Sequence, residues 1–152
     1  MVSETIIENV KDTIAVCSTI IEAAEREIAW LLPAPLLVIA AQYHVETKGL
    51  IQKGGQVRGI TTISSLYVET VRGLLDMGVD VRHINDYTGT FMLVADRRQS
   101  VSSFFLNVED LSLDDKIVAF WTENADYAEY LLSNFDTVWE DAMDAKKRIN
   151  EF

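Results

Sequence analysis

Cysteine, proline and histidine are all scarce in this chain of 152 residues. The single cysteine, Cys17, excludes an internal disulfide and a cysteine-ligated metal cluster, and its place on an apolar stripe predicts a small buried side chain. The two prolines and a hydrophobic share of 49% exclude a disordered, low-complexity chain. These absences leave one compact domain of ordinary size, which we expect to span residues 1–152.

The two histidines, His44 and His83, have neither the spacing nor the acidic neighbours of a metal site, so we expect no metal and no other cofactor. The polar segment 107–116 is rich in carboxylates but lacks the alternation and the central glycine of a calcium loop. Its acidic residues therefore predict a solvated loop; they are Glu109, Asp110, Asp114 and Asp115.

Basic residues are also few, since 13 Lys and Arg stand against 24 Asp and Glu, for a net charge of -11. Such a chain repels phosphates, which argues against direct contact with nucleic acid or an acidic membrane. The most apolar run, residues 28–41, contains Pro33 and Pro35 and is shorter than the roughly 20 residues of a membrane span. Because Glu4 and Glu8 stand among the first apolar residues, we expect no secretory leader and a cytoplasmic protein.

Helical periodicity dominates the first 25 residues and predicts one long amphipathic helix. Its apolar stripe either packs on the domain's own core or on a second copy of the chain, as a dimerisation surface. The stripe consists of Ile6, Val10, Ile14, Cys17, Ile21 and Ala24.

Strand and helix patterns then alternate. We expect a buried strand over residues 27–32, a helix over 36–49, a strand over 56–63 and a helix ending at Gly78. Strands joined by helices predict crossover connections and a parallel sheet, so the fold class is α/β.

The second half changes pattern, with strand-like runs that no helix separates, and these predict antiparallel hairpins at one side of the sheet. The runs cover residues 79–84, 90–95, 101–106 and 117–121. A long helix that begins at the cap Asn124 closes the chain. Its expected buried stripe is Leu131, Phe135, Val138, Trp139, Ala142 and Ile149, while Asp136, Glu140, Asp141 and Asp144 are expected to face solvent.

Four segments in this order carry a family resemblance: EREIAWLLP, GVDVRHI, FMLVAD and the closing run from WTEN to FDTVWEDA. From about Ile20 onward the chain resembles the effector domain of TrmB-type archaeal transcription regulators. The resemblance implies a phospholipase-D-like mixed sheet flanked by helices. It also implies transcription regulation through binding of a small effector and formation of a homodimer.

The resemblance also bears on catalysis. Active phospholipase-D-like enzymes carry a His, a Lys two residues later and an Asp five residues after the Lys, which act as nucleophile, phosphate clamp and electrostatic support. If Asp96 takes the Asp position, Gly89 replaces the His and Phe91 replaces the Lys. We therefore expect no catalytic residues and no enzyme activity.

Six residues are candidates for contacting an effector, and we expect this effector to be a flat, sugar-like molecule. Asp96 and Thr90 flank the expected cleft, and His83 is either a ligand contact or a structural strand histidine. The others are either cleft residues or ordinary strand and core positions: Ser103, Trp121 and Thr122.

Three functions follow from these observations. The first is a sensor domain of the TrmB-like kind. Because residues 1–25 predict a helix and not a winged helix-turn-helix, either a protein partner carries the DNA-binding function or the chain is the sensor half of a longer regulator. The second is a ligand-free dimerisation or adaptor module. The third is a residual phosphodiesterase that uses His83 and Asp96.

Overall fold

The computed structural model describes residues 4–85, 90–104 and 116–152. Their strands form one mixed sheet of eight strands in the order β1-β7-β6-β5-β2-β3-β4-β8. In chain order the strands are β1 Glu4–Asn9, β2 Glu27–Leu31, β3 Gln56–Thr61, β4 Asp80–His83, β5 Thr90–Ala95, β6 Gln99–Phe104, β7 Lys116–Thr122 and β8 Met143–Asp144.

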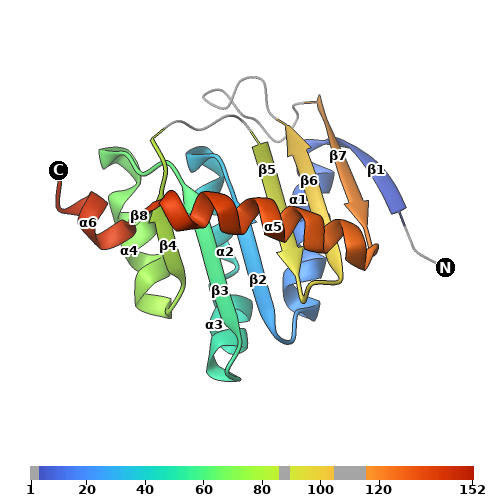
Figure 1. Ribbon diagram of the computed structural model, residues 1–152, viewed down its shortest axis with the longest axis horizontal. Helices are drawn as coiled ribbons and strands as arrows, with labels where there is room; N and C mark the ends of the chain where they lie inside the picture. The colour runs from blue at the N-terminus through green and yellow to red at the C-terminus, as the bar shows by residue number, and fades with distance from the viewer. Residues whose placement is uncertain (1–3, 86–89, 105–115) are drawn as a thin grey trace.

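Helices cover both faces of this sheet (Figure 1). One face carries the helices of the first half of the chain, and α5 runs across the strands on the other face. The helices are α1 Val10–Ala23, α2 Leu37–Gln42, α3 His44–Gln52, α4 Val68–Met77, α5 Ala125–Asp141 and α6 Ala145–Ile149, with short 3-10 turns at Ala34–Leu36 and Ser65–Tyr67. The predicted α/β class is confirmed.

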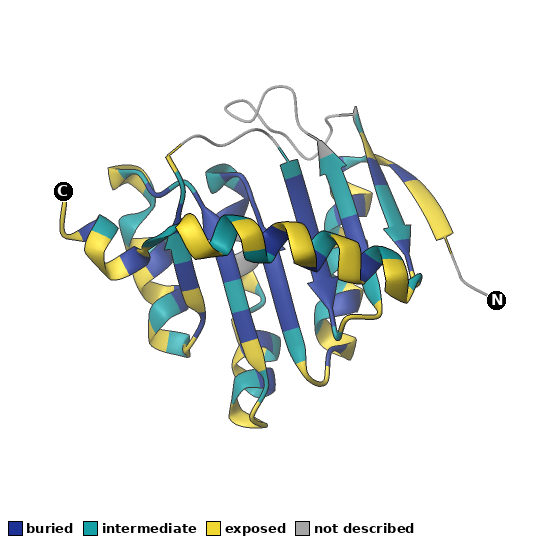
Figure 2. Ribbon diagram, in the orientation of Figure 1, coloured by how far each residue is buried: buried dark blue, intermediate teal, exposed yellow. Residues whose placement is uncertain are grey.

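The central strands are buried along most of their length (Figure 2). Because side chains alternate along a strand, each face of the sheet has its own apolar layer. Trp30, Phe91 and Leu93 face α1 to α4, whereas Leu31, Ile60 and Met92 face α5.

The parallel part of the sheet is β2, β3 and β4, as the crossover pattern predicts. The antiparallel part is β5, β6, β7 and β1. The strand over residues 79–84 is not part of the antiparallel group, since β4 pairs in parallel with β3 and β5 lies against β2. The two predicted strands on either side of residues 86–89 are therefore not neighbours.

Three helix predictions need correction. The helix predicted over residues 36–49 is two helices, α2 and α3, which are separated at Tyr43. Residues 1–25 do not form one helix, because β1 occupies Glu4–Asn9 and the Asn9 side chain caps α1 by accepting from the Asp12 amide at 2.8 Å. The closing helix is also not continuous. It ends at Asp141, and Met143–Asp144 pair with β4 before α6 begins.

Candidate ligand-binding site

A cavity of about 60 Å³ lies between α1 and the face of the sheet that it covers. Most of its wall is aliphatic or aromatic, and side chains come from α1, from strands of both halves of the sheet and from the α3–α4 region. The lining residues are Val10, Thr13, Ile14, Cys17, Ile21, Ile28, Trp30, Leu32, Leu36, Tyr43, Thr47, Val57, Leu74, Val79, Phe91, Leu93 and Ile117.

Gly59 makes room for one wall of this cavity. It pairs with Trp30 in the parallel register of β2 and β3, and a Cβ at Gly59 would lie 2.2 Å from the indole ring of Trp30. The ring therefore lies across the glycine. Phe91, at the position where the resemblance to phospholipase-D-like enzymes expects a lysine, is 4% exposed and forms another part of the wall.

Cys17 contributes its thiol to the same wall from α1 and is half-buried. Burial raises the pKa of this thiol to about 12, so it stays neutral at physiological pH. The prediction of a small apolar role for Cys17 agrees with this environment.

The six residues predicted to contact an effector do not gather at one place. Thr90 and Asp96 lie at opposite ends of β5, about 20 Å apart at 3.3 Å per residue. His83 and Ser103 lie toward the Thr90 end, and Thr122 lies toward the Asp96 end. One small ligand does not contact Thr90 and Asp96 together.

His83 is 2% exposed, and both of its ring nitrogens have partners. Nδ1 accepts from the Ile63 amide at 2.8 Å, so Nε2 carries the proton and donates to Asn85 Oδ1 at 2.8 Å. Burial lowers the pKa of His83, and the Arg148 guanidinium lowers it further, against the raising effect of the Asn85 hydrogen bond. The neutral imidazole ties β4 to the segment after β3.

Asp96 binds the chain's own backbone. Its carboxylate accepts from the amides of Glu25, Arg26 and Glu27 at 2.9, 2.7 and 3.0 Å. Burial acts to raise the pKa of Asp96, but these three amides and the nearby Arg98 outweigh it and hold the pKa below its usual value. Asp96 thus fixes the entry to β2 against the β5–β6 turn.

The other three candidates also have partners within the protein. The Ser103 hydroxyl donates to the Val118 carbonyl at 2.7 Å, and Trp121 Nε1 donates to Gln99 Oε1 at 3.3 Å. Thr122 is fully buried, and its hydroxyl oxygen accepts from the Asn124 amide at 3.0 Å, immediately before α5. Thr122 is therefore part of the start of α5.

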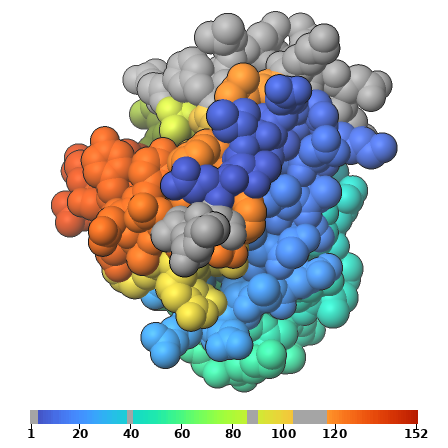
Figure 3. Space-filling view, turned by 90° about the vertical axis from the view of Figure 1, so that its right-hand side faces the viewer, coloured from blue at the N-terminus to red at the C-terminus, as the bar shows by residue number. Residues whose placement is uncertain are grey.

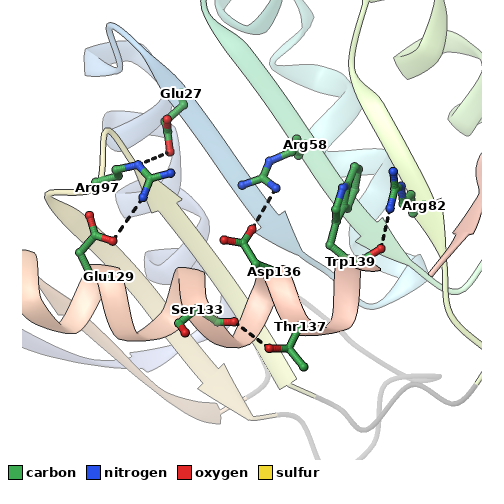
Figure 4. Close-up of polar contacts among 9 residues, drawn as sticks. All are labelled: Glu27, Arg58, Arg82, Arg97, Glu129, Ser133, Asp136, Thr137 and Trp139. Carbon is green, nitrogen blue, oxygen red and sulfur yellow. Dashed lines mark hydrogen bonds and ion pairs between the residues drawn. The ribbon is translucent and has the colours of Figure 1, made fainter. Parts of the chain in front are cut away.

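On the opposite face, three arginines attach α5 to the rest of the fold (Figure 4): Arg58 and Arg82 of the sheet, and Arg97 of the β5–β6 turn, which pairs with Glu129 at 3.2 Å. Arg58 of β3 donates to Asp136 at 3.0 Å, and Arg82 of β4 donates to the Trp139 carbonyl at 2.6 Å, with its guanidinium 4.2 Å from a Trp139 ring centroid. Asp136 was expected to face solvent; its side chain is 46% exposed and also forms an ion pair with Arg58 of the sheet.

Neither a metal site nor a membrane span is present in the part of the chain that the structure describes. No group of three or more His, Cys, Asp or Glu side chains there is placed to hold a metal ion. No described helix is long and apolar enough to cross a membrane. The acidic residues Glu109, Asp110, Asp114 and Asp115, like Gly89, lie outside the described residues.

Sequence reasoning missed the cavity because most of its lining residues read as ordinary core. Trp30, Leu32 and Phe91 stand in apolar strand runs, where burial alone explains them. The available signal was Gly59, a glycine inside a β-branched strand, since such a glycine often marks the close approach of another group.

No protein-family model and no curated protein matches this sequence. Solved structures match its fold. TrmBL2, an archaeal chromatin protein described as showing a novel mode of DNA binding, is 16% identical, with a TM-score of 0.71 over 93% of this chain and 54% of TrmBL2. The chain thus spans about half the length of TrmBL2.

Two further solved structures match along nearly their whole length. Nuc from Salmonella typhimurium, a phospholipase D family member, is 12% identical with a TM-score of 0.74, over 95% of this chain and 98% of Nuc. NucT from Helicobacter pylori is also 12% identical, with a TM-score of 0.74 over 95% of this chain and 99% of NucT. The fold is therefore phospholipase-D-like, and it is shared with a TrmB-like protein.

The prediction that the chain is not an enzyme is wrong in the light of these matches, because the chain has the fold of Nuc, a phospholipase D family member, and of NucT. The prediction rested on placing Asp96 in the Asp position of the catalytic pattern. Asp96 binds three backbone amides at the start of β2, so it is a poor anchor for locating a nucleophile.

Proposed function

We propose that this chain is a small-molecule-binding domain of a TrmB-like regulator. The observation that carries the proposal is the cavity beneath α1, in a domain whose fold matches TrmBL2. An effector in this cavity contacts α1 and both halves of the sheet, and its binding energy can therefore alter how α1 packs. A protein partner or another part of the regulator supplies the contact with DNA.

The same proposal includes a homodimer. The apolar stripe of α1 is not available for this role, since Ile14, Cys17 and Ile21 line the cavity. A different surface supports a dimer, the exposed face of the two outer strands β1 and β7, where Ile6 and Val118 are 65% and 69% exposed. Figure 3 views this side of the molecule, with the dark blue N-terminal segment beside orange β7.

A thermal-shift screen of metabolites tests effector binding. A ligand that binds only the folded state raises stability by RT ln(1 + [L]/Kd), about 2.7 kcal/mol at one hundred times Kd. We expect at least one compound to raise Tm in a saturable manner. If the whole screen leaves Tm unchanged at millimolar concentrations, the sensor proposal fails.

Phosphodiester hydrolysis is a second candidate, favoured by the fold match to Nuc and NucT. His83 and Asp96 do not act together in this reaction, because they lie toward opposite ends of the strands. The test is turnover of bis(p-nitrophenyl) phosphate by the wild-type chain, compared with His83→Gln and His44→Gln. Turnover indistinguishable from buffer would remove this candidate.

A further inference from the structure

We propose that the cavity beneath α1 takes an uncharged, largely apolar ligand group, such as a short alkyl chain or a small hydrocarbon ring, and not a sugar. This inference rests on the ligand-binding function proposed above and assigns the chemical class of the ligand.

The wall of the cavity excludes charge. None of its described lining residues is Asp, Glu, Lys, Arg or His. Trp30, Phe91 and Leu93 form much of the sheet side and are each no more than 5% exposed. An ionised group placed against them would lose its hydration without gaining a partner of opposite charge.

The wall also offers few hydrogen bonds. The Thr13 hydroxyl already donates to the Asn9 carbonyl at 2.8 Å, which leaves the indole N–H of Trp30 and the side chains of Tyr43, Thr47 and Cys17 as polar lining groups. Each sugar hydroxyl that is buried without a partner weakens binding, and an ordered water needs two to four polar neighbours. A hydrocarbon group has no such requirement.

The volume fits a group and not a large molecule. About 60 Å³ is several times the roughly 15 Å³ that a water requires, so it takes up part of a short chain or of a ring. The cavity approaches the surface along α1, where Ile14, Ile21 and Ile117 are only half-buried. The remainder of a longer ligand leaves by this side, where a polar end stays hydrated.

Two kinds of probe, an aromatic hydrocarbon and a series of alcohols, test the inference on the full chain. Toluene and the series 1-butanol, 1-pentanol and 1-hexanol are titrated against the 15N-labelled protein and followed by amide chemical shifts. We expect saturable shifts at Ile14, Cys17 and Leu93. Affinity should rise about fourfold for each added methylene that the cavity buries.

A filling variant shows where the probes bind. Cys17→Leu places a larger side chain in the cavity from α1, and we expect at least a tenfold loss of toluene affinity. Ala15→Leu is the matched control, because Ala15 is exposed on the same helix outside the lining and should leave affinity unchanged. Thr47→Leu fills the cavity from α3 and replaces Cys17→Leu if that variant does not fold.

Two results overturn the inference: no saturable binding of any probe to the wild-type chain, or undiminished binding in a folded filling variant. The metabolite screen separates this failure from that of the wider proposal. A sugar that raises Tm while toluene and the alcohols do not bind would leave ligand binding standing and remove only the apolar class.

Discussion

At the scale of single residues, Asp96 connects the parallel and antiparallel parts of the sheet, because it follows β5 and binds the amides at the start of β2. It has a left-handed φ of 56°, which Asp and Asn tolerate better than most residues, so Asp96→Asn removes charge without straining the backbone. We expect a loss of about 1.5–3 kcal/mol in the free energy of unfolding, because hydrogen bonds to a carboxylate are among the stronger ones. Urea denaturation measures it.

Asp76→Asn is the control for this change, since Asp76 is exposed on α4. Equal stability of Asp96→Asn and the wild type would mean that the three amide contacts contribute nothing to folding. Asp96 directly follows the strand predicted over residues 90–95, but its partners are about seventy positions earlier in the chain and no local pattern identifies them.

His83 makes stability depend on pH. Its pKa in the folded state is below the usual 6.5, so the unfolded chain binds more protons as the pH falls through and below 6.5, and the folded state is then disfavoured. The stability from neutral His83 is fully present above pH 6.5 and declines on acidification. We expect His83→Gln to show a shallower decline between pH 7.5 and 5.5 in urea titrations.

The exposed His44 gives the matched variant, His44→Gln, which should retain the wild-type pH dependence. Identical pH profiles for His83→Gln and the wild type would contradict the role of His83. His83 is buried on the same face of β4 as Val81, as the alternation of side chains along a strand requires, whereas its Ile63 partner depends on how the chain folds back after β3.

At the scale of elements, the pairing of β2 with β3 depends on Gly59, which leaves room for the Trp30 ring. The added methyl of Gly59→Ala collides with the Trp30 ring, and overpacking of this kind costs about 1–3 kcal/mol or more. The Trp30 ring should also move, which changes its fluorescence and the cavity. Gly73→Ala is the contrast, because a Cβ there meets nothing within 4 Å and α4 should gain up to about 1 kcal/mol.

Attachment of α5 depends on Trp139, which lies against both Arg58 and Arg82. Trp139→Ala removes a large half-buried ring together with two cation–π contacts, and we expect a loss of about 2–4 kcal/mol. Amide exchange in Ala125–Asp141 should accelerate more than in β3. Glu140→Ala, an exposed neighbour, should change neither quantity, and unchanged exchange in Trp139→Ala would rule out this attachment.

Elements with a distinct local signal were predictable, and those that depend on distant pairing were not. The strand over 27–32 and the helix that begins after Asn124 are present because apolar runs and caps act locally. The break after Asp141 is different. Met143 and Asp144 leave the helix to pair with β4, and only the tertiary fold provides that partner.

Residues 4–9 were predicted as helix but form the strand β1. Ile6 fits a helical period as well as a strand, and the periodicity was extended through the capping residue Asn9. Asn9, with an acidic residue three positions later, is a helix-start signal that could have placed the boundary. This error also affected the functional prediction. Reading residues 1–25 as one helix combined an edge strand and a cavity-lining helix into a single dimerisation surface.

At the scale of the whole molecule, the α/β class followed from the order of strand and helix patterns and the phospholipase-D-like fold from the family resemblance, while the location of a ligand site followed from neither. A cavity arises from side chains that α1, β2 and β5 bring together, and each of them reads as core in its own segment. Catalysis likewise could not be judged from one motif alignment anchored on Asp96.

The last prediction concerns the homodimer and the outer strands of the sheet. β1 and β7 are the two strands at this end of the sheet, and a second copy that packs on their exposed face gives a two-fold dimer that covers Ile6 and Val118. Val118→Arg places a charge in that contact. We expect the wild type to sediment as a concentration-dependent dimer and Val118→Arg to dissociate at concentrations at least tenfold higher. Val45→Arg, on α3 with a similar exposure of 67%, should sediment as the wild type does. A wild-type monomer at all concentrations, or a Val118→Arg dimer of undiminished strength, would exclude this face as the interface.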